Sequence, residues 1–125
     1  MKYSIVFPGQ GSQSIGMLLD LSSNFSIVSE IFQEASDALG VDLWKIAQED
    51  HEALNLTENT QPIMLASGYA TYKVLSNEVK LSPVCMAGHS LGEYTALVAS
   101  RSVKFFDAIK LVRRRAELMQ SAVPK

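Results

Sequence analysis

The sequence has 125 residues, of which 47% are apolar, and a formal net charge of −2. This length suits one compact domain, and the composition excludes global disorder. Charges of both signs are spread along the chain, which argues against nucleic-acid binding. No segment has the roughly 20 apolar residues of a membrane span, and the start lacks a signal-peptide pattern. A single cysteine fits a reducing compartment. We therefore expect a cytoplasmic protein with no membrane or nucleic-acid partner.

Short apolar runs and amphipathic stretches alternate along the chain. Ser4–Phe7 reads as a buried strand that ends at Pro8, and Pro83–Ala87 reads as a second buried strand with Cys85 in the core. Gln48–Thr60 is polar and is expected to be mostly loop. The pattern predicts helices over Ile15–Leu21, Phe25–Leu39 with Gly40 as its stop, Leu43–Ala47, Thr60–Val79 with Thr60 as cap and Pro62 in the first turn, Leu91–Ser100 and Lys104–Gln120.

Strands that alternate with helices predict a parallel, three-layer α/β arrangement. Two strands are few for a sheet, since an average sheet has about 5–6. We therefore expect residues 1–125 to be a segment of a longer chain that supplies the remaining strands. The apolar spacing of the last helix predicts an inward face formed by Phe105, Phe106, Ile109, Val112, Ala116 and Met119.

The segment Gly88-His89-Ser90-Leu91-Gly92 has the pattern of a nucleophile elbow. In such an elbow a serine lies on a sharp strand-to-helix turn, and small residues on both sides allow strand and helix to approach. The segment follows a predicted strand and precedes a predicted helix, which favours Ser90 as a nucleophile. The alternative is a tight turn in which Ser90 only caps the helix.

The amide of Leu91, at the start of the helix after the serine, is positioned to donate to an oxyanion. A second donor has to come from another loop, and the candidate is Gly9-Gln10-Gly11 after the first strand, because parallel strands end at the same sheet edge. This loop has two other interpretations. A dinucleotide site is disfavoured because Ser14 replaces the third glycine of that motif, whereas a plain glycine turn stays open.

Three further groups are candidates for the site. His89 adjoins the serine, but neighbouring side chains on a sharp turn diverge, so a pocket or packing role is favoured over a base. His51 lies among charged residues and is expected to be exposed. Two interpretations are open for Arg113-Arg114-Arg115. The three side chains form a solvated basic face, or they have separate roles, because consecutive helical positions differ by about 100° and cannot all share one face.

Two motifs together resemble the malonyl-CoA:acyl carrier protein transacylase family of bacterial fatty acid synthesis, whose pattern the acyltransferase domains of polyketide synthases share. The motifs are Phe7-Pro8-Gly9-Gln10-Gly11-Ser12-Gln13 and Gly88-His89-Ser90-Leu91-Gly92-Glu93-Tyr94. Thr60-Gln61-Pro62 and the arginine of the last helix also match, so the resemblance extends over the whole chain.

The resemblance implies that Ser90 is acylated, and that the amides of Gln10 and Leu91 form the oxyanion hole. It places the Gln10 side chain near the acyl group, with His89 in the pocket. In this family an arginine twenty-five residues after the serine binds the malonyl carboxylate, which is Arg115 here. A guanidinium suits that role because it holds a carboxylate bidentately. Arg113 and Arg114 become candidates for docking an acidic carrier protein.

The resemblance further implies an α/β-hydrolase-like fold in which residues 1–125 form the first part of the large subdomain. The catalytic histidine and a ferredoxin-like subdomain would lie beyond this segment, so the segment alone is expected to be inactive. Malonyl-CoA is the implied substrate and acyl carrier protein the implied partner. No cofactor is implied, because phosphopantetheine belongs to the carrier, and the complete protein is expected to be a monomer.

Two other functions stay open at this stage. A serine hydrolase or thioesterase shares the elbow, but it needs an acidic triad member, and only Glu93, Asp107 and Glu117 follow the serine, none of them before a histidine. The second alternative is a non-catalytic module that binds carrier protein or coenzyme A.

Overall fold

The computed structural model describes residues 1–123. Two short strands, β1 (Ser4–Phe7) and β2 (Cys85–Gly88), pair in parallel, with Ser4 opposite Cys85 and Phe7 opposite Gly88. The prediction of an α/β protein with parallel strands is thereby confirmed. The second strand begins two residues later than predicted and ends at the first glycine of the elbow.

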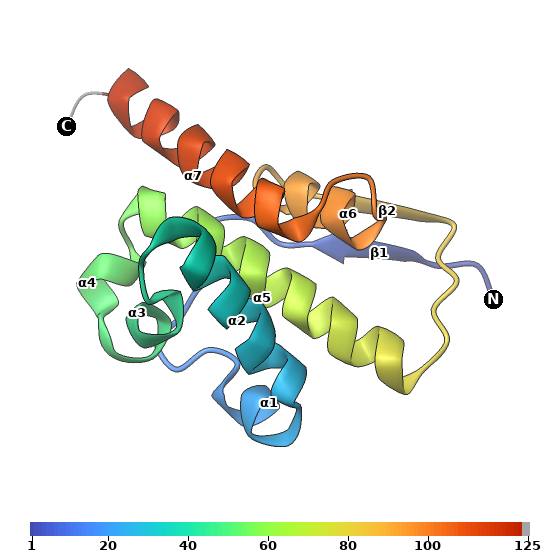
Figure 1. Cartoon of the computed structure of the whole chain (residues 1–125). Coiled ribbons are helices and arrows are strands. Elements are labelled where there is room, and N and C mark those ends of the chain that lie inside the picture. Colours follow the sequence, from blue (N-terminus) through green and yellow to red (C-terminus); the bar gives the residue numbers. More distant parts are fainter. Residues whose placement is uncertain (124–125) are drawn as a thin grey trace.

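Helices cover one face of this ribbon, where α6 packs against both β1 and β2 (Figure 1). In chain order the helices are α1 (Leu19–Asn24), α2 (Ser26–Leu39), α3 (Leu43–Glu49), α4 (His51–Leu54), α5 (Thr57–Glu78), α6 (Gly92–Ala99) and α7 (Phe105–Ala122). Within the described part of the chain, none of them combines the length and the apolarity that a membrane span requires.

The prediction for the chain before α5 was partly wrong. The segment expected to be loop contains α4, which the Asp50 side chain caps by accepting from the amide of Ala53 at 2.9 Å. The first helix was placed too early, because residues 15–18 form turns before α1 begins at Leu19. The helix after the glycine loop therefore starts only where Leu18, in a left-handed conformation, has redirected the backbone.

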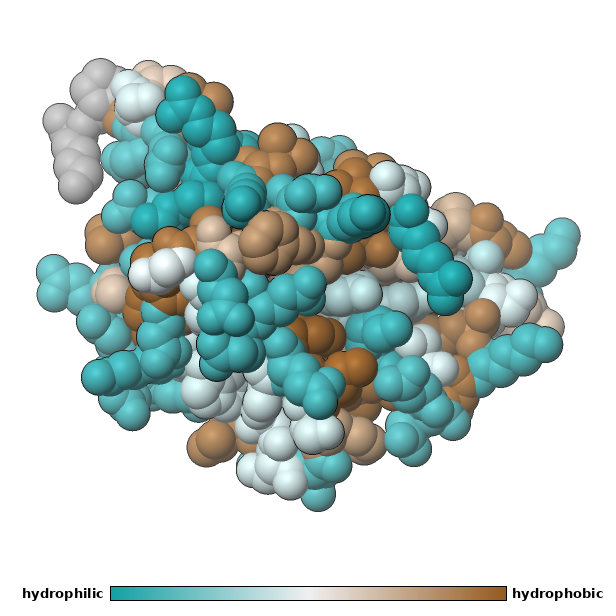
Figure 2. Space-filling view, in the orientation of Figure 1, coloured by the Kyte–Doolittle hydropathy of each residue, from teal (hydrophilic) through white to brown (hydrophobic). Residues whose placement is uncertain are grey.

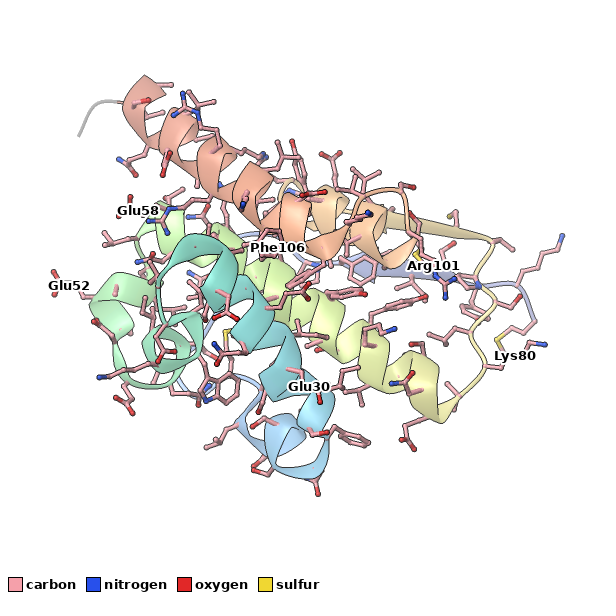
Figure 3. The ribbon with its side chains drawn as sticks, in the orientation of Figure 1. Glu30, Glu52, Glu58, Lys80, Arg101 and Phe106 are labelled. Carbon is pink, nitrogen blue, oxygen red and sulfur yellow. The ribbon has the colours of Figure 1, made fainter. Side chains whose placement is uncertain are left out.

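Helix α5 begins at Thr57, before the predicted cap. Thr60 lies inside the helix, where its hydroxyl donates to the carbonyl oxygens of Leu54 and Leu56. Pro62 therefore lies in the second turn, where its missing N–H leaves the carbonyl of Glu58 without its helical donor. Arg113 of α7 supplies the replacement, with Nη1 at 3.2 Å from that oxygen. Glu58 is labelled at this end of α5 in Figure 3.

The core lies around α5, which α2, α6 and α7 enclose. Residues 59–67 of α5 are buried without a break, so this helix is covered on all sides in its first half. Tyr69 stacks on Phe105 with ring centroids 5.0 Å apart, and burial together with Glu34 raises the pKa of the Tyr69 hydroxyl against the opposing effect of Arg101.

The strands are not buried, contrary to prediction. Phe7 is enclosed by helices, but Val6 on the opposite face of β1 is 70% exposed. Cys85, predicted to be in the core, is exposed on β2. The reason is the size of the sheet: within residues 1–123 it has two strands, so the helices cover one face and leave the other face and both edges open.

The inward face of α7 was also predicted in part incorrectly. Phe105, Ile109, Val112 and Ala116 are buried as expected, together with Ala108. Phe106 and Met119 are 39% and 42% exposed. Figure 2 shows hydrophobic side chains interspersed among hydrophilic ones along α7, beside the mostly hydrophilic surface of α2 to α4. The apolar stripe of α7 is therefore narrower than its composition suggests.

Candidate active site

Ser90 lies on the turn between β2 and α6. Its φ angle is 53°, in the left-handed region that serine rarely adopts, which is the strained geometry expected of an elbow. A Cβ atom on Gly88 would overlap the backbone carbonyl of Gly92, so the strand and the helix meet at van der Waals distance. The backbone therefore fixes the position of Ser90, and its side chain is exposed at the carboxyl end of β2.

The loop after β1 packs directly against the elbow. The amide of His89 donates to the carbonyl of Phe7 at 3.1 Å, and a Cβ added to Gly9 would lie 2.5 Å from the carbonyl oxygen of His89. The loop is braced on its outer side, where the Gln10 amide nitrogen Nε2 donates to the Thr57 hydroxyl at 3.1 Å. The parallel register thus brings the two predicted motifs to one sheet edge.

The backbone amides of Gln10 and Leu91 have no hydrogen-bond acceptor among residues 1–123. Leu91 is itself buried, at the first position after Ser90, whereas Gln10 is exposed. Free N–H groups beside a serine are the donors that an oxyanion requires. The arrangement is therefore compatible with an oxyanion hole formed by these two amides.

Arg115 reaches Ser90 from α7. Its Nη2 donates to the serine Oγ at 2.9 Å, and its Nη1 donates to the side-chain oxygen Oε1 of Gln61 at 2.8 Å. The guanidinium carbon also lies 5.3 Å from the ring centroid of Tyr94, within the range of a cation–π contact. The structure thus brings together Ser90 and Arg115, the two residues that the family resemblance assigned to one site.

The three consecutive arginines have separate surroundings. Arg113 donates to the Glu58 carbonyl and to Asn59 Oδ1, both at 3.2 Å, and it also pairs with Glu117 at 3.4 Å. The side chain of Arg114 is 67% exposed and lies 3.6 Å from Glu117. A uniform solvated face is therefore excluded, and Arg113 has a structural role in joining α5 and α7.

Gln61 is the residue of this site that the sequence reasoning missed. It is fully buried, with its oxygen toward Arg115 and its nitrogen donating to the sulfur of Met119 at 3.4 Å. The tripeptide Thr60-Gln61-Pro62 matches the family pattern, but that match assigns Gln61 no role in the site. The signal that would have found it is a glutamine inside a long uninterrupted buried run, where an amide needs specific partners.

The two histidines make no side-chain hydrogen bond to Ser90 or to any other described residue. His89 is exposed next to the serine, and His51 is exposed at the start of α4. Within residues 1–123 no group of three His, Cys, Asp or Glu side chains could hold a metal ion. The described residues therefore place a serine, free amides and a guanidinium together, with no base within hydrogen-bond reach of the serine.

Comparisons with known proteins agree with this arrangement. The family model of the acyl transferase domain matches residues 4–125. A malonyl CoA-acyl carrier protein transacylase from Haemophilus influenzae is 54% identical over an alignment that covers 99% of this chain and 40% of that protein. This chain therefore spans about two fifths of the length of the curated relatives that it matches.

Solved structures give the same result. An acyl carrier protein S-malonyltransferase from Vibrio cholerae has a TM-score of 0.96 at 50% identity, over 99% of this chain and 41% of that chain. A malonyl-transacylase solved in complex with a type II PKS acyl carrier protein has a TM-score of 0.97 at 49% identity, over 100% of this chain and 41% of that chain. With an elbow serine, a facing arginine and a family match over nearly its whole length, this chain belongs to the acyl transferase domain family.

Proposed function

We propose that the protein containing this segment moves a malonyl group from coenzyme A to an acyl carrier protein, as a step of fatty acid biosynthesis. The observation that carries the proposal is the bond of 2.9 Å between Arg115 Nη2 and Ser90 Oγ. It places a permanent cation beside a serine whose backbone has elbow geometry, so an acyl group attached to Ser90 would have its far end beside a guanidinium.

In the proposed reaction the Ser90 oxygen attacks the thioester carbonyl, and coenzyme A leaves as its thiol. The amides of Gln10 and Leu91 stabilise the oxyanion of the tetrahedral intermediate. The carrier's phosphopantetheine thiol then attacks the serine ester and takes the acyl group, which is ping-pong chemistry. The base that Ser90 needs would come from outside the described residues.

Arg115 supports malonyl over acetyl as the acyl group. A guanidinium holds a carboxylate through two parallel hydrogen bonds, whereas an acetyl group leaves the cation with neutral acceptors only. The side chains of His89, which adjoins the serine, and of Gln10, in the loop that packs on the elbow, are proposed to line the acyl pocket. The relatives' names point the same way, since they are transacylases of malonyl CoA and acyl carrier protein.

The finer architecture is part of the same proposal. Residues 1–125 would be the first portion of a large subdomain with a three-layer, α/β-hydrolase-like sheet, and a ferredoxin-like subdomain would be supplied elsewhere in the protein. We propose a monomer that needs no cofactor and binds malonyl-CoA and acyl carrier protein in turn. A cytoplasmic location is a further prediction, supported by the single cysteine.

The direct test is the intact mass of the natively expressed protein before and after incubation with malonyl-CoA. We expect the mass of one malonyl group to be added to Ser90, to be lost on addition of acyl carrier protein, and to be absent from Ser90→Ala. Release of the group to water at the same rate with and without carrier would instead identify a hydrolase. Binding of carrier protein without any adduct would identify a non-catalytic binding module.

A further inference from the structure

Arg115 is a cation held entirely by neutral groups. Its two terminal nitrogens donate to Gln61 and Ser90, and its plane lies near the ring of Tyr94. Among residues 1–123 it has no carboxylate partner. The other two arginines of the run, in contrast, both pair with Glu117. Arg115 can therefore still bind an anion, and in the absence of one its Nη2 donates a hydrogen bond to the Ser90 hydroxyl.

This bond has a consequence for the reactivity of Ser90. Attack on a carbonyl uses a lone pair of the serine oxygen, and a donor at 2.9 Å occupies one of the two lone pairs. The donor is a cation, so it also withdraws electron density from the oxygen. The elbow holds the Ser90 backbone in place, because no space separates Gly88 from Gly92. The guanidinium lies at the end of a long side chain, so its movement can free the oxygen while the Ser90 backbone stays in place.

We propose that the hydrogen bond from Arg115 to Ser90 restrains the serine oxygen, and that the carboxylate of the incoming acyl group breaks this bond. We call this bond the latch. This inference rests on the proposed function and extends it. A carboxylate competes for the guanidinium with two charged oxygens against one neutral hydroxyl, and an arginine–carboxylate pair is frequently bidentate, with two parallel hydrogen bonds in place of one. When Nη2 turns to the carboxylate, the serine oxygen is free to attack. A neutral acyl group leaves the latch closed.

Gln61 limits how the Arg115 guanidinium can move. Because this side chain is fully buried and its nitrogen is engaged by Met119, its oxygen offers Arg115 a fixed anchor for Nη1. The guanidinium can therefore turn about this anchor, so that Nη2 leaves Ser90 while Nη1 keeps its bond. Arg115 would then determine acyl specificity twice, through the affinity for the carboxylate and through the reactivity of the serine.

The experiment measures Ser90 reactivity without coenzyme A or carrier protein. The natively expressed protein is treated with phenylmethylsulfonyl fluoride, a neutral reagent, and the rate of mass gain on Ser90 is followed. Formate and malonate are added in parallel with sodium chloride at equal ionic strength. A hydrogen bond to a charged group is worth about a factor of ten or more in an equilibrium, so we expect both carboxylates to accelerate labelling about tenfold.

Two variants make the result specific. Arg115→Ala should react faster than the wild type without any carboxylate and should not respond to formate or malonate. Lys110→Ala removes an exposed cation of the same helix that lies over the Phe106 ring, and it should keep the wild-type rate and the full carboxylate response. Circular dichroism spectra that match the wild type would establish that both variants are folded.

Three results would overturn the latch. One is a wild-type rate that the carboxylates leave unchanged or lower, because formate is too small to block access to Ser90. Another is an Arg115→Ala variant that reacts no faster than the wild type, which would show that the guanidinium does not restrain the serine. The third is a carboxylate response that survives in Arg115→Ala. The malonyl-CoA adduct described above tests the transacylase function separately, so the two failures are distinguishable.

Discussion

At the scale of single residues, the site depends on a close backbone approach rather than on a hydrogen-bond network. Ser90 has a φ angle of 53°, and such strain persists only where the surroundings determine the conformation. Gly88 helps to fix the conformation of Ser90, because its missing side chain lets Gly92 pack directly on the strand. Glycine at this position is therefore a steric requirement of the elbow.

We predict that Gly88→Ala lowers the free energy of unfolding by at least about 3 kcal/mol, because the added methyl group overlaps the Gly92 backbone. Gly40→Ala is the matched control: its φ is 66°, and no atom lies within 4 Å of an added Cβ, so only conformational strain of about 1–2 kcal/mol is expected. Urea denaturation of both variants checks this. Equal losses would show that steric overlap at the elbow is not the determining factor.

At the scale of elements, the pairing of α5 with α7 positions the arginine over the serine. Pro62 removes one helical hydrogen bond from α5, and Arg113 satisfies the carbonyl that this leaves at Glu58. Arg115, two residues further along α7, contacts Gln61 of α5. The irregular start of α5 and the arginines of α7 are therefore complementary, and the crossing of these helices sets the geometry of the site.

We predict that Arg113→Met lowers the free energy of unfolding by about 1–3 kcal/mol, because it leaves a carbonyl and the Asn59 side chain without their donor. Adding Pro62→Ala should restore part of this loss, since alanine supplies the N–H that the Glu58 carbonyl lacks. Urea denaturation of the two single variants and the double variant gives the coupling energy, expected at about 0.5–1.5 kcal/mol. Strictly additive effects would contradict the interpretation that Arg113 replaces the N–H donor that Pro62 lacks.

At the scale of the whole molecule, the two-stranded sheet is the least covered part of residues 1–123. Its two strands have one face on the helices, while Val6 on the other face is 70% exposed. Unpaired strand edges with apolar side chains are templates for pairing with another chain. The helical core is closed around α5, so an association site is expected at the sheet rather than at the helices.

We predict that residues 1–125, expressed alone, self-associate as their concentration rises, and that Val6→Lys reduces this association. The lysine places a charge on the exposed strand face, which opposes pairing between strands. Leu111→Lys, on the 48% exposed helical surface of α7, is the matched control and should leave association unchanged. Sedimentation velocity over a range of concentrations distinguishes the two. Association that both lysines reduce equally would indicate general hydrophobic contact.

The sequence by itself determined the local features. Apolar spacing identified α2, which ends at Gly40 in a left-handed conformation as predicted, and the glycine pattern identified the elbow at Ser90. Where a motif needs a particular backbone conformation, few residue types can satisfy it, so the residues alone indicate the structure. The distance of twenty-five residues from Ser90 to Arg115 came from a resemblance, because helical periodicity does not choose among three adjacent arginines.

Only the tertiary structure decided the partners of these residues. Burial of β1, β2 and Cys85 was predicted incorrectly because an apolar strand is buried only where a second layer covers it, and composition does not reveal that layer. The contacts of Gln61 and Arg113 depend on how α5 crosses α7, which no local pattern encodes. The sequence thus determined that a serine lies on a strand-to-helix elbow, and the packing of α5 on α7, two helices far apart in the sequence, decided that Arg115 donates a hydrogen bond to it.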